Sequence, residues 1–173
     1  MRKTGFAIIF LSLILFSQAY SSHALERNAQ KLDSLNLPHD VSIHLFAREV
    51  PRARHMAFDD QGALFLSQAK EGKVVALPDS DKNGEADKKV LIIENRDIPH
   101  GLAFIQLEEG YYLYIAEETQ VIRLKRLAKP FKYGKPETII ANIPDGGHFT
   151  RTLKIKNNKL YLSRSEEHTS ELQ

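Results

Sequence analysis

Residues 55–77, HMAFDDQGALFLSQAKEGKVVAL, decide the fold, because their pattern recurs twice further along the chain. Residues 100–124 read HGLAFIQLEEGYYLYIAEETQVIRL, and residues 150–163 read TRTLKIKNNKLYLS. Each copy has a short strand-like segment, a polar turn and a second segment that runs Leu-aromatic-aliphatic and ends in Ser or Ala. Short apolar runs separated by turn residues indicate antiparallel hairpins. The pattern therefore predicts a chain built from a repeated β unit.

The spacing of the copies predicts which β fold they form. The second strands start at Leu64, Leu113 and Leu160, so the period is about 47–49 residues, within the range of propeller blades. We predict an all-β chain that forms an incomplete β-propeller of about two to three blades. A β-sandwich with unrelated hairpins is the alternative. Residues 41–46 also alternate apolar and polar, which favours one more strand before the first copy.

The N-terminal segment has the organisation of a secretory signal peptide, which we assign to residues 1–24. Arg2 and Lys3 precede an apolar run at residues 5–16, and Ser22, His23 and Ala24 form a small-x-small cleavage site. The apolar run is shorter than the roughly 20 residues that a membrane-spanning helix needs. We therefore expect a periplasmic or secreted protein without a membrane span after cleavage.

The C-terminal segment, residues 164–173, reads RSEEHTSELQ. A DNA string that encodes this peptide looks like a common short-read sequencing adapter, so we interpret these residues as a non-native tail. The propeller part then comprises residues 25–163, and we expect the natural protein to continue with further blades.

Composition excludes some classes of function. The chain has 24 Lys and Arg against 22 Asp and Glu, with a formal net charge of +2. Such a balanced charge lacks the basic surface that nucleic-acid binding needs, so we expect no nucleic-acid partner. The chain has no cysteine, so it contains no disulfide bond.

An acidic loop at residues 79–87, DSDKNGEAD, has the oxygen-rich spacing of a calcium-binding loop. Calcium takes six to eight oxygen ligands. Gly84 permits the sharp turn, whereas Val90 stands where an EF-hand has its bidentate Glu. The expected ligands are the side chains of Asp79, Asp81, Asn83 and Asp87 and the backbone carbonyl of Glu85. A solvated acidic turn is the alternative interpretation.

Three histidines stand where copies of the repeat begin. His148 follows a Gly-rich turn, and a histidine can act as a general base near neutral pH. Arg151, three residues later, could bind an anionic group of a cofactor. His100 is expected to occupy the corresponding place one blade earlier, and His55 the same place in the first copy. We predict His148 as catalytic and His100 and Arg151 as cofactor-binding, while His55 is expected only to cap a turn.

Four segments in order resemble the soluble glucose/sorbosone dehydrogenase family. They are residues 50–57 (VPRARHMA), 79–87, 99–104 (PHGLAF) and 147–153 (GHFTRTL). The resemblance covers roughly residues 37–163. It implies a six-bladed periplasmic propeller that oxidises aldose sugars with pyrroloquinoline quinone and calcium.

The resemblance also implies roles for single residues. A histidine at the position that resembles His148 takes the sugar hydroxyl proton, and the residue at or beside His100 lines the quinone pocket. The family's main basic quinone ligands and its cofactor calcium ligands lie further along than this chain extends. The loop at residues 79–87 would hold a structural calcium ion.

Three functions follow from these observations. The first is a sugar dehydrogenase with a small-molecule aldose or sorbosone-type substrate, present here as a fragment that we expect to be inactive alone. The second is a metal-dependent sugar-lactone hydrolase, which needs acidic metal ligands at the propeller channel. The third is a non-catalytic propeller that binds a carbohydrate or a partner.

Overall fold

The computed structural model describes residues 35–145 and 148–164. The predicted signal peptide and residues 165–173 of the predicted tail lie outside the described residues. The chain divides into two compact units, Met1–Leu45 and Phe46–Gln173, and every described strand belongs to the second. Residues 41–46 do not form the strand that their alternation predicts. Within the described ranges, no helix has the length and hydropathy needed to cross a bilayer.

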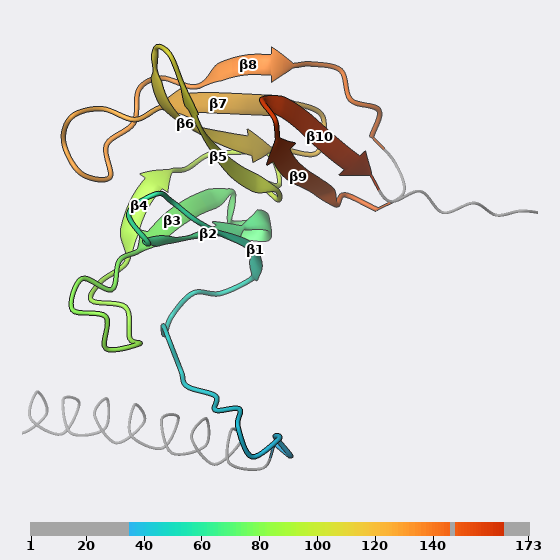
Figure 1. The fold of residues 1–173 in the computed structure, drawn as a ribbon. Helices are drawn as coiled ribbons and strands as arrows, with labels where there is room; N and C mark the ends of the chain where they lie inside the picture. The colour runs from blue at the N-terminus through green and yellow to red at the C-terminus, as the bar shows by residue number, and fades with distance from the viewer. Residues whose placement is uncertain (1–34, 146–147, 165–173) are drawn as a thin grey trace, which may run out of the picture. The chain divides into compact units, whose positions relative to one another are not determined.

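The first sheet contains four antiparallel strands in the order in which they follow along the chain (Figure 1). The strands are β1 (Ala53–Phe58), β2 (Leu64–Gln68), β3 (Lys73–Leu77) and β4 (Val90–Ile93). A short 3-10 turn, η1 (Ala69–Glu71), joins β2 to β3 and ends at Gly72. Gly72 has φ 61°, and a Cβ there would lie 2.7 Å from the Arg96 carbonyl oxygen. Only glycine therefore suits this turn.

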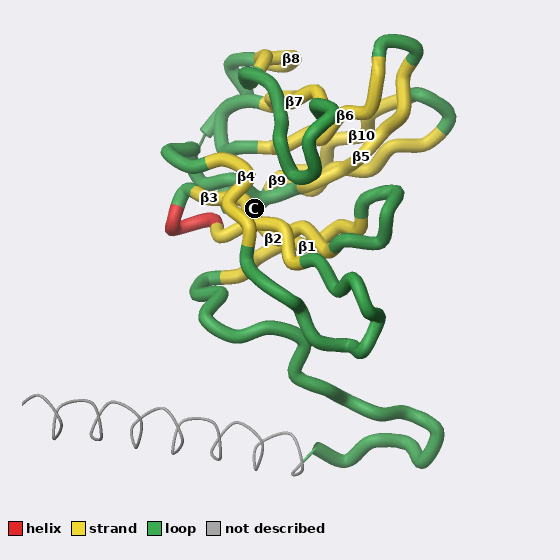
Figure 2. Tube along the Cα trace, turned by 90° about the vertical axis from the view of Figure 1, so that its left-hand side faces the viewer, coloured by secondary structure: helices red, strands yellow, loops and turns green. Residues whose placement is uncertain are grey.

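The second sheet repeats the same four-stranded antiparallel order, and a hairpin follows it (Figure 2). The strands of the sheet are β5 (Leu102–Leu107), β6 (Gly110–Ala116), β7 (Val121–Lys125) and β8 (Glu137–Ile140). The hairpin is formed by β9 (Arg151–Lys156) and β10 (Lys159–Arg164). Asn157 and Asn158 connect them with positive φ angles, which asparagine tolerates better than most residues.

The first strands of the three units lie next to one another, because β1 contacts β5 and β5 contacts β9. Sequential four-stranded meanders whose first strands are neighbours are the blades of a β-propeller. The described residues form two blades and the first hairpin of a third. The prediction of an all-β, partial propeller is confirmed.

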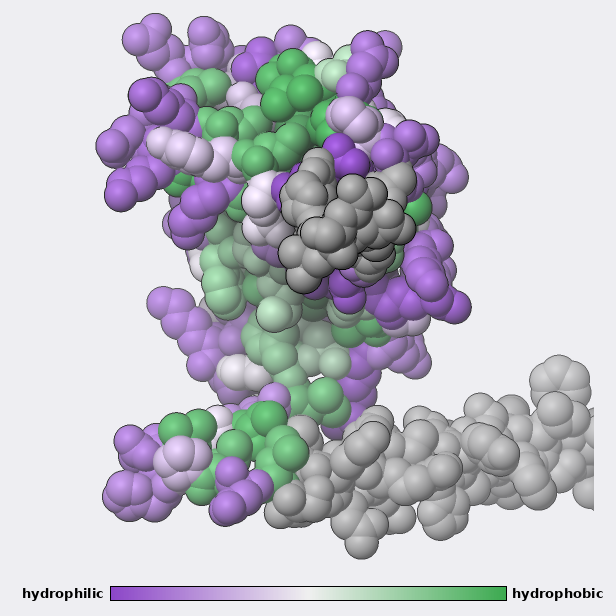
Figure 3. Space-filling model, turned by 90° about the vertical axis from the view of Figure 1, so that its right-hand side faces the viewer, coloured by the Kyte–Doolittle hydropathy of each residue, from purple (hydrophilic) through white to green (hydrophobic). Residues whose placement is uncertain are grey.

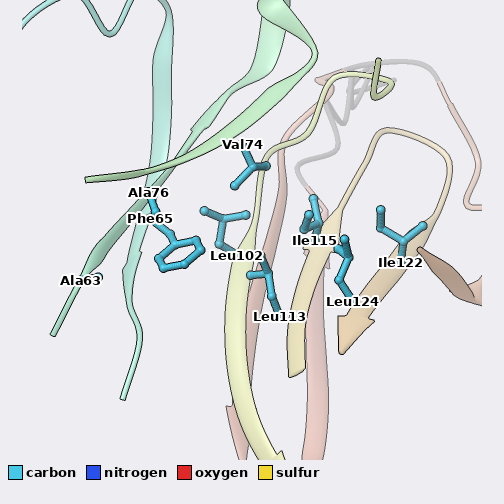
Figure 4. Packing of buried hydrophobic residues seen from close by; sticks show 9 residues of the cluster. All are labelled: Ala63, Phe65, Val74, Ala76, Leu102, Leu113, Ile115, Ile122 and Leu124. Atoms are coloured by element: carbon cyan, nitrogen blue, oxygen red, sulfur yellow. The ribbon is translucent and has the colours of Figure 1, made fainter. Parts of the chain in front are cut away.

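The largest apolar cluster fills the space between the first two blades (Figure 4). The ring of Phe65 on β2 is completely buried and meets Phe104 of the second blade edge-to-face, with ring centroids 4.9 Å apart. Phe131 and Tyr133 also approach Phe65, at 6.5 and 6.1 Å. The buried members of the cluster are Ala63, Phe65, Val74, Ala76, Leu102, Leu113, Ile115, Ile122 and Leu124.

Two smaller clusters cover the outer faces of these blades. One lies between the second blade and the β9–β10 hairpin, where Leu153 packs with Tyr112, Tyr114 and Ile143. The other covers the far face of the first blade and includes Leu64, Leu66, Val75 and Leu77. Figure 3 shows apolar surface between the polar side chains of the described residues. The exposed apolar side chains include Met56 and Phe58 of β1.

Polar contacts also join the first two blades. Glu117 is fully buried and forms an ion pair with Arg96, whose Nη2 lies 2.9 Å from Oε2 of Glu117. Gln120 donates a further hydrogen bond to the same carboxylate oxygen at 2.7 Å. Elsewhere, Asp60 forms an ion pair with Arg126, and its backbone N–H donates to the Tyr111 hydroxyl at 2.8 Å. These contacts hold the two sheets in one relative position.

Candidate active site and acidic loop

The strand registers align the paired positions of the three blades. The third residue of each Leu-aromatic-aliphatic motif pairs with Met56 in the first blade, Leu102 in the second and Leu153 in the third. Two positions earlier in the sequence stand Arg54, His100 and Arg151, respectively, and Arg54 lies where the register of β1 shifts, between Ala53 and His55. This register corrects the expectation that the three histidines occupy equivalent places. Arg151 is the counterpart of His100, His55 lies one position later, and His148 lies three residues before its strand.

Although they are not equivalent, His55 and His100 are neighbours, with ring centroids 5.7 Å apart. Ser67 on β2 links their backbones. Its hydroxyl donates to the His100 carbonyl oxygen at 2.8 Å, and its oxygen accepts the His55 backbone N–H at 3.1 Å. Ser67 is itself completely buried. The small residue that ends the repeat motif therefore places two histidines side by side.

Hydrogen bonds assign the tautomer of each ring. The Leu102 backbone N–H donates to Nδ1 of His55 at 3.3 Å, so the proton of a neutral His55 lies on Nε2. Nδ1 of His100 lies 3.1 Å from the carbonyl oxygen of Arg151. A carbonyl only accepts, so His100 carries its proton on Nδ1 and leaves Nε2 as an acceptor. The pair thus offers one N–H donor and one lone pair.

Burial lowers the pKa of both histidines, because it disfavours the charged imidazolium. At His100 the hydrogen bond to the Arg151 carbonyl raises the pKa, whereas the guanidinium charges of Arg54 and Arg151, and His55 when it is protonated, lower it further. The net shift is downward for both groups, so both rings are neutral near pH 7. A neutral imidazole can accept or donate a proton without losing its partners.

Phe149 and Arg54 extend this cluster. The rings of His100 and Phe149 meet edge-to-face with centroids 6.3 Å apart, and the guanidinium carbon of Arg54 lies 5.4 Å from the Phe149 centroid. Arg54 is exposed, and within the described part of the chain it forms no hydrogen bond or ion pair. The N–H groups of the Arg54 guanidinium are thus available to a ligand.

Our sequence analysis missed Arg54 as a site residue. The signal that could have revealed it is its place two residues before Met56, matching His100 before Leu102.

Arg151 has a different environment from Arg54. Its side chain is completely buried. Its guanidinium donates four hydrogen bonds, all to backbone carbonyl oxygens. This geometry favours a structural role over direct contact with a cofactor. Its assignment as a cofactor-binding residue stays a prediction.

His148 is exposed and follows residues 146–147, which lie outside the described residues. Its backbone carbonyl accepts a hydrogen bond from Nη1 of Arg151 at 2.8 Å. The structure therefore links His148 to His100 through Arg151, whose own carbonyl oxygen lies 3.1 Å from Nδ1 of the His100 ring. The assignment of His148 as the catalytic base stays a prediction.

A groove of about 510 Å³ runs over the three first strands. It is lined by residues of β1, β5 and β9, including His55, Phe104 and Lys154. This volume lies within the range of pockets that bind small molecules. The described lining contains no Asp or Glu. The groove thus combines aliphatic and aromatic walls with a histidine.

The acidic loop lies between β3 and β4, away from the first strands of the blades. It brings carboxylate oxygens of Asp79, Asp81 and Asp87 within 4.8 Å of one another. Hydrogen bonds from Ser80 hold the pKa of the Asp87 carboxyl below its usual value. Gly84 turns the chain with φ 85° and donates to Asp79 at 3.0 Å. Three of the five predicted ligands therefore converge.

The remaining two predicted ligands are Asn83 and Glu85. The Asn83 side-chain oxygen accepts the Glu85 backbone N–H at 2.8 Å, and its Nδ2 donates to Asp81 at 2.9 Å. The side chain of Asn83 is therefore engaged within the loop itself. Oxygen-only ligand sets of this kind suit calcium, and the calcium site stays a prediction.

Together these features define a β-propeller with a candidate small-molecule site at the ends of its first strands. The TrAA12-like family model matches residues 35–172, and the chain belongs to this family. The narrower resemblance to soluble glucose/sorbosone dehydrogenases is not confirmed by this match. No curated protein matches the chain.

Solved structures with the same fold include two of Trichoderma reesei Carbohydrate-Active Enzymes Family AA12, an iodide structure and a calcium structure. Each is 23% identical with a TM-score of 0.60, and the match covers 76% of this chain and 36% of that one. The holo form of the pyranose dehydrogenase PQQ domain from Coprinopsis cinerea is 18% identical with a TM-score of 0.52, over 62% of this chain and 25% of that one. The chain therefore spans 36% of the length of the AA12 structures it matches.

Proposed function

We propose that this chain is part of a longer, exported sugar dehydrogenase that uses pyrroloquinoline quinone. Membership of the TrAA12-like family and the fold shared with a pyranose dehydrogenase PQQ domain support this proposal. The observation that carries it is the cluster of neutral His55 and His100 with Arg54 and Phe149. This cluster combines the donor, acceptor, cation and aromatic face that an anionic planar cofactor needs.

The described residues fit such a cofactor. Pyrroloquinoline quinone is flat and carries several carboxylates. A guanidinium binds carboxylates through paired N–H groups, and Arg54 has its N–H groups unengaged in the described part of the chain. The Phe149 ring offers a face for stacking, and Nε2–H of His55 offers a hydrogen bond to an oxygen. When bound, the quinone supplies the electron acceptor for oxidation of a sugar hydroxyl.

The chain's own chemistry in that reaction is proton transfer and orientation. In the proposal, His148 accepts the proton of the sugar hydroxyl as general base, a role that requires a neutral imidazole. His100 provides Nε2 as a hydrogen-bond acceptor that orients a hydroxyl group. The acidic loop lies apart from these residues, so its calcium ion would stabilise the fold between β3 and β4.

The groove lining favours this function over the two alternatives. A metal-dependent lactone hydrolase needs carboxylate ligands at the channel, and the described groove residues include none. A purely carbohydrate-binding propeller has no need for a buried and a half-buried histidine that are both neutral and have fixed tautomers. Residues 1–24 support the proposal of export, and the ligand proposed for the groove is a small sugar.

Quinone binding tests this proposal. Arg54→Gln should weaken binding of pyrroloquinoline quinone, measured by calorimetry, by about tenfold to a hundredfold, because one charge-assisted contact is lost. Arg52→Gln is the matched control, since Arg52 is also exposed but forms an ion pair with Glu71 at 3.2 Å. Absence of quinone binding by the wild-type protein, or equal effects of the two substitutions, would refute the proposal.

A further inference from the structure

Arg151, the first residue of β9, combines a permanent charge with complete burial. Burying a charge is costly unless hydrogen bonds replace the lost water. At Arg151, four backbone carbonyl oxygens replace the lost water. Nε donates to Glu118 at 3.0 Å, Nη1 to His148 at 2.8 Å and to Thr150 at 3.1 Å, and Nη2 to Pro144 at 3.0 Å. Four of the five guanidinium N–H groups are therefore engaged by backbone carbonyl oxygens.

These acceptors belong to separate segments of the chain. Glu118 lies in the turn between β6 and β7, Pro144 lies after β8, and His148 lies on the way into β9. One planar guanidinium therefore ties the backbone at Pro144 and the backbone at His148 to the β6–β7 turn of the second blade. The backbone N–H of Ile143 adds a hydrogen bond to the Thr119 carbonyl at 2.8 Å, which anchors the residue before Pro144 to the same turn.

The backbone of Arg151 acts on the second histidine. Its carbonyl oxygen lies 3.1 Å from Nδ1 of His100 and can only accept a proton. His100 is buried, with 6% of its surface exposed, so no bulk water competes for this contact. One residue thus holds the backbone of His148 through its side chain and the ring of His100 through its main chain.

We infer that Arg151 is a positioning residue, which fixes the backbone of His148 and sets the tautomer of His100. It acts through the two histidines and does not touch the ligand. The role of His148 as a catalytic base rests on the proposed function. The contacts of Arg151 with His148 and His100, which we call the Arg151 clamp, do not. Lysine cannot replace Arg151, because a single ammonium group lacks the fork that reaches several carbonyls at once.

Nuclear magnetic resonance of the full chain tests this inference without any measurement of activity. Long-range ¹⁵N–¹H spectra of the histidine rings report their tautomers, and amide hydrogen exchange reports the order of residues 148–152. In the wild-type protein, His100 should carry its proton on Nδ1. Arg151→Lys keeps the backbone carbonyl at this position but loses the guanidinium hydrogen bonds that hold it in place. These amides should therefore exchange at least about tenfold faster, because charge-assisted hydrogen bonds are lost. The carbonyl should then shift relative to Nδ1 of His100, so that His100 populates both tautomers.

The control is Glu118→Gln, which keeps the backbone carbonyl that Arg151 uses and should leave both readouts unchanged. A merely structural arginine would lower stability in Arg151→Lys but leave the His100 tautomer as in the wild type, and that result would overturn the inference. If Arg151→Lys does not fold, the spectra of the wild-type protein alone still test the inference. A proton on Nε2 of His100, or rapid exchange of the Arg151 Nε–H, would overturn the inference.

The same sample separates this inference from the proposed function. Titration with pyrroloquinoline quinone tests the function, and failure to bind refutes only that. The tautomer and exchange results test the clamp, whatever the ligand is.

Discussion

Phe65 offers a sharp test of the packing between the first two blades. Its ring belongs to the first blade, yet it is completely buried against Phe104, Phe131 and Tyr133, which belong to the second blade and the loop after β7. Phe65→Ala should therefore remove contacts on both sides of the interface between blades. Phe58→Ala is the matched control, because Phe58 lies in the same sheet but is 65% exposed.

The burial of the Phe65 ring sets the expected loss in the free energy of unfolding. Replacing a fully buried Phe by Ala costs about 3–5 kcal/mol, through lost transfer free energy and the cavity left behind. The edge-to-face pair with Phe104 places the value toward the upper end, since such pairs contribute about 0.5–1.5 kcal/mol beyond burial. An exposed site changes the free energy of unfolding by about 0.5 kcal/mol or less. We expect a difference of about 4 kcal/mol between the two substitutions.

Urea unfolding followed by circular dichroism measures this difference. With a slope of about 2 kcal/mol per molar urea, Phe65→Ala should move the midpoint down by about 2 M, or leave the chain unfolded in water. Phe58→Ala should barely move it. Equal midpoints for the two variants would show that the first two sheets do not pack as blades, and the account of the fold would fail.

The remaining predictions concern the acidic loop, the buried ion pair and pH. Asp81→Asn should abolish calcium binding in calorimetry, whereas Glu85→Gln should not, because Glu85 is expected to contribute only its backbone carbonyl; equal loss would contradict the ligand assignment. Glu117→Gln should lower the free energy of unfolding by about 3 kcal/mol, because the Arg96 charge loses its partner; an unchanged urea midpoint would show that the Arg96–Glu117 ion pair does not stabilise the fold. Burial lowers the pKa of His100 below its ordinary value of 6.5, so the folded state binds fewer protons than the unfolded state. Stability should therefore fall as pH drops from about 6.5 through the folded pKa, and His100→Asn should flatten that slope; identical slopes would refute a buried neutral ring.

The repeat made the blade architecture predictable from the sequence. Leu64 begins β2, Leu113 lies inside β6 and Leu160 is the second residue of β10. All three lie in second strands, because apolar side chains at a fixed period face successive interfaces between sheets. Residues 41–46 show the limit of the same reasoning. Their alternation is that of a strand, but no neighbouring strand pairs with them in the described residues, and an unpaired strand has no ladder to stabilise it.

The site was less predictable, because register and burial decide it. Counting from the histidines aligned His100 with His148, whereas counting back from the paired strand residues Leu102 and Leu153 makes Arg151 the counterpart of His100 and leaves Arg54 at a register shift in β1. These two arginines look alike in sequence. One is exposed beside Phe149, and the other is buried among carbonyl oxygens, a difference that only the tertiary packing creates.

Dye-linked oxidation of aldose sugars by the complete propeller, with and without added pyrroloquinoline quinone, tests the central claim most directly. The account predicts activity that depends on the quinone and falls by about a hundredfold or more in His148→Ala, in line with the loss of a general base. Activity that needs no quinone, or that is unchanged by His148→Ala, would contradict it.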